Sequence, residues 1–374
     1  MTVRVALLTY STRPRGGVVH TLALAEALAR EGADVTVHAV GQGGDQAFFR
    51  PVDRAVRVRL AALADVDGEP VGARVQRSID ALAAAVDPDA YDVVHAQDCI
   101  SANAVRGVMR TVHHLDQFTT PELARCHERA IVTPVAHVCV SRAVAAELAA
   151  GWGIAATVIP NGVEAERFAR AASDDPDAVA ARTRWRETLG RGPVVLAVGG
   201  IEPRKGTLDL VEAVRLLATG GRPARLVIAG GETLFDYRDY RAAFDDTCAR
   251  SGVEPLVLGP VDHERLPALV AAADVFAFPS TKEGFGLAAM EALAAGVPVV
   301  VRDLPVLREV FGDTVRYAAD PAGLAAALAG DDDRSGPDRE ARRAAGRALA
   351  RAHRWDDVAR AHLALYERVV SARQ

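Results

Sequence analysis

Residues 279–298 read PSTKEGFGLAAMEALAAGVP, and two short apolar segments, residues 275–278 and 299–301, enclose this stretch. The two segments are typical of buried strands, and the alanine-rich part between them predicts a helix. Gly296 suits the left-handed position at the end of that helix, and Pro298 cannot continue it. A strand, a loop, a helix and a second strand in this order predict a parallel sheet covered by helices.

The same stretch also has features of a ligand site. Backbone N–H groups at the start of a helix have no partner within the helix, and they attract negatively charged or hydroxyl-rich ligands. Glu291 lies on an apolar stripe formed by Leu287, Ala288, Ala294 and Ala295. A carboxylate within an apolar stripe is costly unless it binds something. We therefore expect Glu291 to contact a ligand.

The composition of the chain limits the possible functions. The chain has 374 residues, 50% of them hydrophobic, and this length predicts two domains rather than one. The net charge is −5, from 44 basic and 49 acidic residues, with no basic tract, so nucleic acid is not an expected partner. The four cysteines form no C-x-x-C pair, which predicts reduced thiols in a cytoplasmic protein. Cys139 lies in an apolar run and is expected in a core.

The amino-terminal segment does not resemble a signal peptide. Residues 3–10 alternate like a buried strand and are too short and too weakly flanked for an export signal. No run of apolar residues reaches the ~20 that span a bilayer, so we expect no transmembrane segment. A peripheral membrane contact stays open, because a substrate can be a lipid.

Apolar strands alternate with amphipathic helices along both halves of the chain. The predicted strands span residues 3–10, 34–40, 92–96, 111–113, 135–140, 194–198, 225–229, 256–258, 275–278 and 299–301. We therefore predict an α/β protein with two doubly wound, Rossmann-like domains that face each other across a cleft. The polar stretch 171–177 is the expected linker, so the domains comprise residues 1–170 and 171–352.

Four loops follow strands and are expected at the carboxyl edges of the sheets, where proteins of this architecture bind ligands. The loops are residues 14–20, 113–118, 199–206 and 279–286. Two sheets whose carboxyl edges face each other would bring all four loops together.

The loop 199–206, GGIEPRKG, predicts a phosphate site. Arg204 and Lys205 are adjacent at a turn from a strand into a helix, so two cations and free amides can bind a diphosphate. The spacing is not that of a P-loop. Only two of the 44 basic residues are lysines, Lys205 and Lys282, and both lie in the predicted ligand loops. We favour a ligand role over a solvated turn for Lys205, whereas Lys282 receives no specific role.

The loops of the first half give weaker signals. Gly16 and Gly17 let a backbone approach a ligand closely, but a plain strand-to-helix turn is an equal alternative. His113 ends a strand within a polar cluster, and we favour a ligand role for it over a packing role. The segment 95–98, HAQD, is a weaker candidate of the same kind. A metal site is not supported, because the tripeptide Asp-x-Asp occurs in four assorted loops and none of them ends a clear apolar strand.

These motifs together resemble glycosyltransferase family 4, whose members have the GT-B fold. The matching segments, which cover nearly the whole chain, are residues 16–17, 158–163, 198–206, 225–230, 258–261, 273–280 and 283–291. Glu283 and Glu291 resemble the E-x7-E motif of the family and, with Arg204 and Lys205, form a strong signature. The strings HAQDCIS (95–101) and TLFDY (233–237) resemble a bacterial subgroup of unclear substrate.

The resemblance implies a site for a nucleotide-sugar donor in the second domain. Arg204 and Lys205 would bind the donor diphosphate and stabilise charge on the leaving nucleotide. Glu291 would bind the ribose, and Glu283 would bind a hydroxyl of the transferred sugar. The remaining donor-binding residues of this loop would be Gly284, Phe285, Gly286 and Leu287, the first three through their backbone amides.

The resemblance also assigns residues outside that loop. Gly16 and Gly17 would lie against the diphosphate, and His113 would lie beside the sugar. Val261 would flank the base. His20 follows the glycines one residue earlier than in many relatives, and no role is assigned to it. Residues 353–374 would form a helix that packs back onto the first domain.

The implied reaction is the transfer of a sugar from a nucleotide donor to an acceptor with retention of configuration and without a metal or other cofactor. The departing phosphate would take the acceptor's proton, since no protein base is assigned. The alternatives are a nucleotide-sugar 2-epimerase of the same fold and a non-catalytic protein that binds sugar nucleotides. The base (uridine, guanosine or adenosine), the sugar, the oligomeric state and the acceptor (a small molecule, glycan or lipid) stay open. The segment 231–252 is either a wall of the donor pocket or an extended helix.

Overall fold

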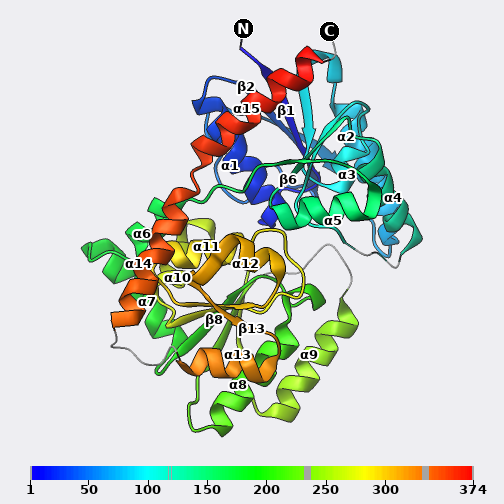
Figure 1. Ribbon diagram of the computed structural model, residues 1–374. Helices are drawn as coiled ribbons and strands as arrows, with labels where there is room; N and C mark the ends of the chain where they lie inside the picture. The colour runs from blue at the N-terminus through cyan, green and yellow to red at the C-terminus, as the bar shows by residue number, and fades with distance from the viewer. Residues whose placement is uncertain (1, 117, 119, 231–236, 331–336, 373–374) are drawn as a thin grey trace. The chain divides into compact units, whose positions relative to one another are not determined.

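The computed structural model describes residues 2–116, 118, 120–230, 237–330 and 337–372, and the chain divides into two units. Unit 1 comprises Met1–Gly162 with His353–Gln374, and unit 2 comprises Val163–Ala352 (Figure 1). Each unit has one parallel sheet with interleaved helices. The predicted class of two doubly wound α/β units is therefore confirmed.

Seven parallel strands form the sheet of unit 1, in the order β3-β2-β1-β4-β5-β6-β7. They are β1 (Arg4–Thr9), β2 (Asp34–Gln42), β3 (Arg57–Leu63), β4 (Val93–Ala96), β5 (Met109–Val112), β6 (Ala136–Cys139) and β7 (Thr157–Val158). The helices are α1 (Gly16–Arg30), α2 (Val71–Ala85), α3 (Cys99–Ala102), α4 (Pro121–Val132), α5 (Arg142–Trp152) and α15 (Trp355–Ser371). Because β2 and β4 lie on opposite sides of β1, the strand order reverses there, and ligands bind at the carboxyl edge near such a point.

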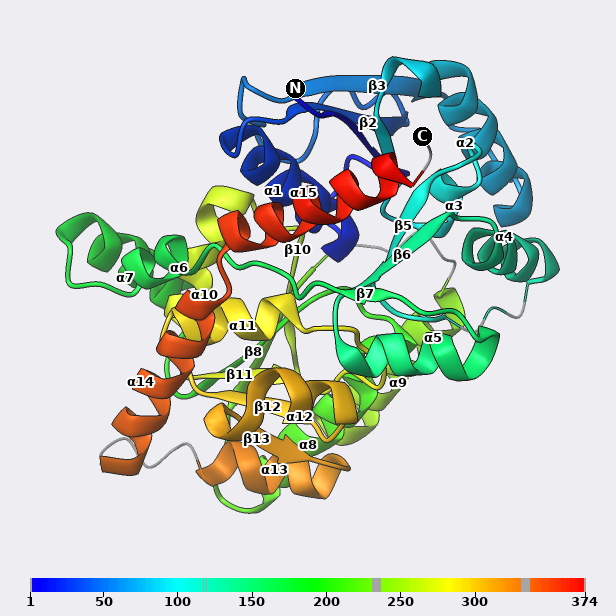
Figure 2. The same ribbon diagram turned by 45° about the horizontal axis from the view of Figure 1, so that its top comes forward.

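The last helix of the chain belongs to the core of unit 1. Helices α1 and α15 lie side by side (Figure 2). Val358 and Leu365 of α15 join the apolar cluster that contains Leu22 and Leu28 of α1. Cys139 is fully buried in a neighbouring cluster, so its predicted place in a core is confirmed.

Gly162 is required where α15 begins. A Cβ atom at Gly162 would lie 2.5 Å from Cδ2 and 2.8 Å from Cα of Trp355, the first residue of α15. We expect Gly162→Ala to destabilise the protein by about 2 kcal/mol, the usual effect of overpacking a core, and to lower the midpoint of thermal unfolding. Gly151→Ala is the control: no atom lies within 4 Å of that position, and alanine in a helix should raise stability slightly. Equal midpoints for Gly162→Ala and the wild type would contradict the prediction.

Six parallel strands form the sheet of unit 2, in the order β10-β9-β8-β11-β12-β13. They are β8 (Val194–Val198), β9 (Arg225–Ala229), β10 (Leu256–Gly259), β11 (Val275–Phe278), β12 (Val299–Arg302) and β13 (Arg316–Ala318). The helices are α6 (Ala165–Ala171), α7 (Pro176–Leu189), α8 (Thr207–Thr219), α9 (Arg238–Ser251), α10 (Leu266–Ala271), α11 (Leu287–Ala294), α12 (Pro305–Phe311), α13 (Pro321–Gly330) and α14 (Pro337–Ala352). Three 3-10 turns, η2 (Pro203–Lys205), η3 (His263–Arg265) and η4 (Gly312–Thr314), complete the described part of the unit.

Two stretches differ from the sequence-based expectation. Residues 171–177 join α6 to α7 inside unit 2, because α6 packs against α7, α10 and α11. Residues 163–170, which the sequence assigned to the first domain, also belong to unit 2. In the segment 231–252, residues 238–251 form helix α9, and residues 231–236 lie outside the described part of the chain.

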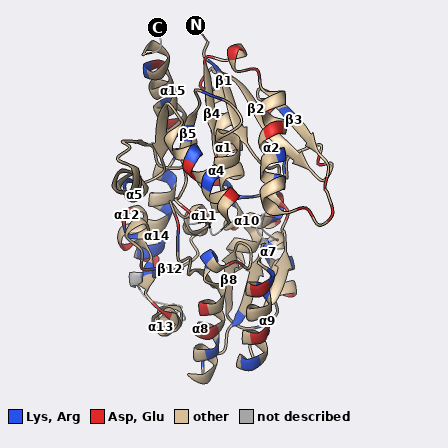
Figure 3. Cartoon of the chain, turned by 90° about the vertical axis from the view of Figure 1, so that its right-hand side faces the viewer, with Lys and Arg blue, Asp and Glu red and all other residues tan. Residues whose placement is uncertain are grey.

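Acidic and basic residues are mixed along the exposed helices. Figure 3 shows both colours on α8 and α9. Arg215 pairs with Glu212 at 2.6 Å, and Arg241 pairs with Asp245 at 3.1 Å, each within one turn of its own helix. Such exposed pairs contribute little stability. No helix among the described residues is long and apolar enough to cross a bilayer.

Candidate active site

Two of the predicted ligand loops of unit 2 lie against each other. They follow β8 and β11, which are neighbouring parallel strands, so both loops leave the same edge of the sheet. Thr281 donates its backbone N–H to the carbonyl oxygen of Arg204 at 2.8 Å. Gly206 has a φ of +63°, and a Cβ atom there would lie 2.2 Å from the carbonyl oxygen of Pro279. A side chain at Gly206 would therefore push the two loops apart.

Three charged side chains meet between these loops. Glu283 Oε1 accepts hydrogen bonds from Lys205 Nζ at 2.7 Å and from Arg204 Nη1 at 2.9 Å. Arg204 Nη2 also donates to Glu202 Oε1 at 3.0 Å. Lys205 Nζ lies 5.1 Å from the ring centroid of Phe278, within the range of a cation–π contact. The sequence predicted Arg204, Lys205 and Glu283 as site residues, and the structure brings all three together.

The loop residues after Glu283 lead into α11. Gly286 occupies the position before the first helical residue with a φ of +95°, and no side chain caps this helix. The amides at the start of α11 are therefore available to a ligand. Phe285 is buried, so its side chain belongs to the core and only its backbone can bind a ligand. Leu287 is the first residue of the helix.

Glu291 is a partly buried carboxyl on α11 of unit 2. Burial, together with the charge of Glu164, raises the pKa of Glu291 to about 8, although the charge of Arg167 opposes this shift. Among the described residues no side chain forms a hydrogen bond or ion pair with this carboxyl. A carboxyl with this pKa is mostly protonated at neutral pH.

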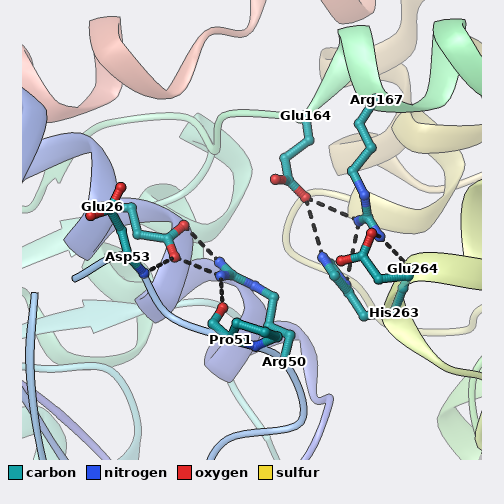
Figure 4. A network of polar contacts seen from close by, with 8 residues as sticks. All are labelled: Glu26, Arg50, Pro51, Asp53, Glu164, Arg167, His263 and Glu264. Atoms are coloured by element: carbon teal, nitrogen blue, oxygen red, sulfur yellow. Dashed lines mark hydrogen bonds and ion pairs between the residues drawn. The ribbon is translucent and has the colours of Figure 1, made fainter. Parts of the chain in front are cut away.

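Glu291 lies close to a polar network that the sequence did not reveal. Arg167 of α6 pairs with Glu164 at 3.3 Å, and its Nη1 lies 3.4 Å from Nδ1 of His263 in η3 (Figure 4). His263 Nε2 lies 3.8 Å from Oε2 of Glu164. Val261, the residue predicted to flank a base, lies two residues before His263 in the loop after β10. Figure 4 also shows an ion pair of unit 1, in which Arg50 Nη1 lies 2.6 Å from Glu26 Oε1. This ion pair joins the segment between β2 and β3 to α1.

The predicted glycine and histidine residues of unit 1 also lie together. The His113 ring lies 3.7 Å from where a Cβ atom of Gly17 would stand, and its centroid lies 4.7 Å from that of His20. His20 Nδ1 lies 2.9 Å from Oδ1 of Asn161. Burial lowers the pKa of His113 to about 3, with a further contribution from His114, and burial also lowers the pKa of His20 strongly. Both rings are therefore neutral near pH 7. Gly16 starts α1 with open space beside it.

The segment 95–98 is mainly structural. His95 Nδ1 bonds to the hydroxyl of Tyr366 at 2.8 Å, and its Nε2 bonds to Thr111 at 2.9 Å. Asp98 caps α3 and accepts the backbone N–H of Tyr10 at 2.9 Å. The weak expectation of a ligand role is therefore wrong for His95 and Asp98, because their polar atoms serve the fold. Gln97 differs, since both of its side-chain polar atoms are buried without a partner.

A cavity of about 250 Å³ in unit 2 is separate from these loops. Its lining includes Pro193 and Asp274, which precede β8 and β11, so it opens at the amino edge of the sheet rather than the carboxyl edge. No group of three or more His, Cys, Asp or Glu residues in the described part of the chain is placed to hold a metal ion.

Several known proteins are similar in sequence to this chain. Residues 14–167 match the domain described as glycosyltransferase family 4, and residues 181–348 match the domain described as glycosyl transferases group 1. D-inositol 3-phosphate glycosyltransferase of Xylanimonas cellulosilytica is 30% identical, over 99% of this chain and 98% of its own length. The chain belongs to glycosyltransferase family 4.

Other proteins similar to this glycosyltransferase include phosphatidyl-myo-inositol mannosyltransferase of Mycobacterium tuberculosis H37Rv, which is 28% identical over 75% of each chain. Among solved structures, sucrose-phosphate synthase from Thermosynechococcus elongatus has a TM-score of 0.79 at 20% identity, covering 99% of this chain and 100% of that one. Anabaena HepE in complex with UDP and glucose has a TM-score of 0.75 at 20% identity, covering 98% and 99%. These structures show that the glycosyltransferase has the GT-B fold, as the sequence resemblance implied.

Proposed function

We propose that this family 4 glycosyltransferase transfers a sugar from a nucleotide-diphosphate sugar to a hydroxyl-bearing acceptor, with retention and without a metal or other cofactor. The contact of Arg204 and Lys205 with Glu283 is the observation that carries the proposal. Two positive charges are held at the carboxyl edge of the sheet, where a diphosphate can gather negative charge as it leaves the sugar. Preorganised charge of this kind is often the largest contribution to catalysis.

Glu283 has a second function in this proposal. Its carboxylate balances the two cations, and its side chain is only 10% exposed. When a diphosphate binds, the phosphate oxygens become partners of the two cations, and Glu283 can then accept a hydrogen bond from a hydroxyl of the transferred sugar. The same carboxylate therefore keeps the cations in place before the donor arrives and orients the sugar afterwards.

The nucleoside end of the donor is assigned to α11 and its surroundings. Glu291 would accept hydrogen bonds from the ribose hydroxyls, which explains why α11 carries a partly buried carboxyl without a protein partner. The amides of Gly284, Phe285 and Gly286 would contact the donor, and Leu287 would line the same region. Val261 would flank the base.

Proton transfer needs no general base from unit 2 in this proposal. The acidic residue bonded to both cations, Glu283, is assigned to a hydroxyl of the transferred sugar once the donor is bound. The departing phosphate would take the acceptor's proton on the face of the sugar from which it leaves, which gives retention. We propose that Gly16 and Gly17 of unit 1 bind the donor diphosphate and that His113 binds the transferred sugar, as the family resemblance implies. Four free cysteines suit a reducing compartment such as the cytoplasm.

A thermal-shift screen with UDP, GDP and ADP tests the donor class. A ligand that binds the folded state raises its unfolding midpoint, so we expect one diphosphate to give a shift of several degrees that Lys205→Ala reduces.

A time course with the matching sugar nucleotide alone then separates a transferase from a 2-epimerase and from a non-catalytic binding protein. Slow release of the diphosphate supports a transferase, and conversion to a second sugar nucleotide supports a 2-epimerase. Binding without turnover in any acceptor mixture would support a binding protein and contradict the proposal.

A further inference from the structure

Two cysteines of unit 1 lie against each other where α3 meets α4. Cys99 is the first residue of α3, and Cys126 lies in the middle of α4. Cys126 Sγ lies 3.5 Å from the carbonyl oxygen of Cys99, although the two residues are 27 positions apart in the chain. The Cys99 thiol also donates a hydrogen bond to the Cys126 sulfur. Two sulfur atoms in contact need only a small backbone movement to form a disulfide.

Asn103, the residue that ends α3, holds the two cysteines together. Its Nδ2 donates to the carbonyl oxygen of Cys99 at 2.7 Å and to that of Cys126 at 2.8 Å. The same nitrogen lies 3.4 Å from Cys126 Sγ. Cys126 is buried, whereas Cys99 is partly exposed. The pair is therefore fixed by the fold and is open to a small molecule from the side of Cys99.

A buried cation stands beside the two thiols. Thr111 of β5 bonds to His95 on the face that α15 covers, so the side chain of Arg110 lies on the opposite face, with α3 and α4. Arg110 is 4% exposed, and its Nε and Nη1 find no hydrogen-bond partner among the described residues. Asp98 offsets part of this charge, but its carboxylate already accepts two backbone N–H groups. An anion that forms on a neighbouring sulfur would stabilise such a cation.

These surroundings make Cys126 the more nucleophilic member of the pair. The hydrogen bond from Cys99 lowers the pKa of the Cys126 thiol, and Arg110 and Asn103 add to this effect, whereas burial and Asp98 oppose it. The thiolate is the form of cysteine that attacks an oxidant. Redox-sensitive cysteines combine this property with a second thiol beside them that resolves the oxidised form. Cys126 and Cys99 meet both requirements.

We propose that Cys99 and Cys126 are a redox modification site, at which hydrogen peroxide converts the two thiols into a disulfide that ties α3 to α4. The Cys126 thiolate attacks one peroxide oxygen and the O–O bond breaks, which gives a sulfenic acid and a hydroxide that takes up a proton. The Cys99 sulfur then attacks the Cys126 sulfur, the S–O bond breaks, and water leaves. The two thiols lose two electrons and two protons, and the peroxide is reduced to two molecules of water. A dithiol reductant restores both thiols by exchange.

The disulfide would act on loops that the proposed function uses. Asp98 immediately precedes α3 and accepts the backbone N–H of Tyr10 at 2.9 Å, and the segment after Tyr10 leads to Gly16 and Gly17. Joining the sulfur atoms replaces the present contacts of Cys126 Sγ and shifts the first turn of α3, together with Asp98. We therefore expect the disulfide to lower turnover. This effect rests on the proposed function, whereas formation of the disulfide does not.

Counting thiols tests the modification site directly. The reduced full chain, with its four free cysteines, is treated with hydrogen peroxide, unfolded and labelled with a maleimide. We expect two thiols to be lost, a peptide pair linked through Cys99 and Cys126 in mass spectrometry, and both thiols to return with dithiothreitol. Cys248→Ser is the matched control, since Cys248 is also partly exposed but burial raises the pKa of its thiol, and this variant should lose the same two thiols. Four remaining thiols, or a disulfide between other cysteines, would overturn the proposal. The wild-type peptide map needs no variant.

Arg110→Met tests the part played by the cation. The thiolate loses its neighbouring positive charge in this variant, so the disulfide should form severalfold more slowly at the same pH. Arg129→Met, on the exposed face of α4, should form it at the wild-type rate. If Arg110→Met fails to fold, Arg110→Lys keeps the charge and should form the disulfide within about threefold of the wild-type rate. An unchanged rate in folded Arg110→Met would show that the cation does not activate the pair.

Diphosphate release tests the effect on turnover. The oxidised and reduced proteins are compared with UDP-glucose, GDP-mannose and ADP-glucose as donors. We expect oxidation to lower release about tenfold and dithiothreitol to restore it, because a shift of about 1 Å near reacting groups can cost about 100-fold. Cys99→Ser should keep its release after peroxide treatment. Unchanged release in protein whose disulfide has formed would overturn the effect on turnover. The absence of release in the reduced wild type with all three donors would count against the proposed function instead, and the thiol count would still decide the modification site.

Discussion

Replacing Lys205 with alanine is expected to lower turnover by about a thousandfold in a protein that stays folded. One well-placed charge or hydrogen-bond donor at the site of developing charge contributes about 10²–10³ in rate. Lys205 Nζ is held 2.7 Å from Glu283 and only 18% of its side chain is exposed, so water is a poor substitute. Stability should change little, because Arg204 still pairs with Glu283 at 2.9 Å.

The chain provides a matched control for this variant. Lys282 is the only other lysine, and it lies in the neighbouring loop. Its backbone oxygen lies 3.4 Å from Arg204 Nη1, and alanine leaves that oxygen unchanged. We expect Lys282→Ala to retain turnover within about threefold, since a charge that is not aimed at the leaving group is screened by water. If Lys205→Ala kept its turnover within tenfold of the wild type and its unfolding midpoint were unchanged, Lys205 would not be a catalytic residue.

The donor loops of unit 2 could be predicted because the signals are local and the topology is simple. Continuous apolar runs mark β8 and β11 as buried parallel strands, and neighbouring parallel strands end at the same edge. Arg204 and Glu283 follow those strands, so their meeting follows from strand order alone. The edge strand β3 was missed because Arg57 and Arg59 are exposed and replace the apolar pattern.

The surroundings of Glu291 could not be predicted in the same way. Glu164 and Arg167 lie more than 120 residues before Glu291 in the chain, and no spacing rule connects them. Their proximity depends on α6 packing against α11, which is a tertiary contact. The sequence also gives no indication of which groups are the hydrogen-bond partners of buried polar atoms. The sequence therefore identified Glu291 as unusual but could not show which charges surround it.

The folded protein should lose stability as the pH rises through the titration of Glu291. Its folded pKa of about 8 lies above the ordinary value of 4.5, so the folded state holds a proton that the unfolded state has released. The stability present below pH 4.5 therefore falls as the pH rises toward 8 and levels off above it. Glu291→Gln removes this loss, and its advantage over the wild type should grow by about 2.7 kcal/mol between pH 6 and pH 9. Urea unfolding at a series of pH values measures this growth, and a difference that stays constant with pH would contradict the raised pKa of Glu291.

Donor binding should show the opposite pH dependence. If ribose hydroxyls bind the ionised carboxylate, the affinity for the nucleoside diphosphate rises with pH, by about 90-fold between pH 6 and pH 9, and levels off above the pKa. The diphosphate also ionises in this range, so the ratio of wild-type to Glu291→Gln affinity isolates the part due to Glu291. Arg167 lowers the pKa of Glu291, so Arg167→Met should move the inflection of that ratio to higher pH. A ratio that does not change with pH would mean that Glu291 binds the ribose as a neutral acid or does not bind it.

Donor binding should also release a proton, because the carboxyl of Glu291 is neutral before the donor binds and ionised afterwards. Calorimetry in two buffers of different ionisation enthalpy would count that proton.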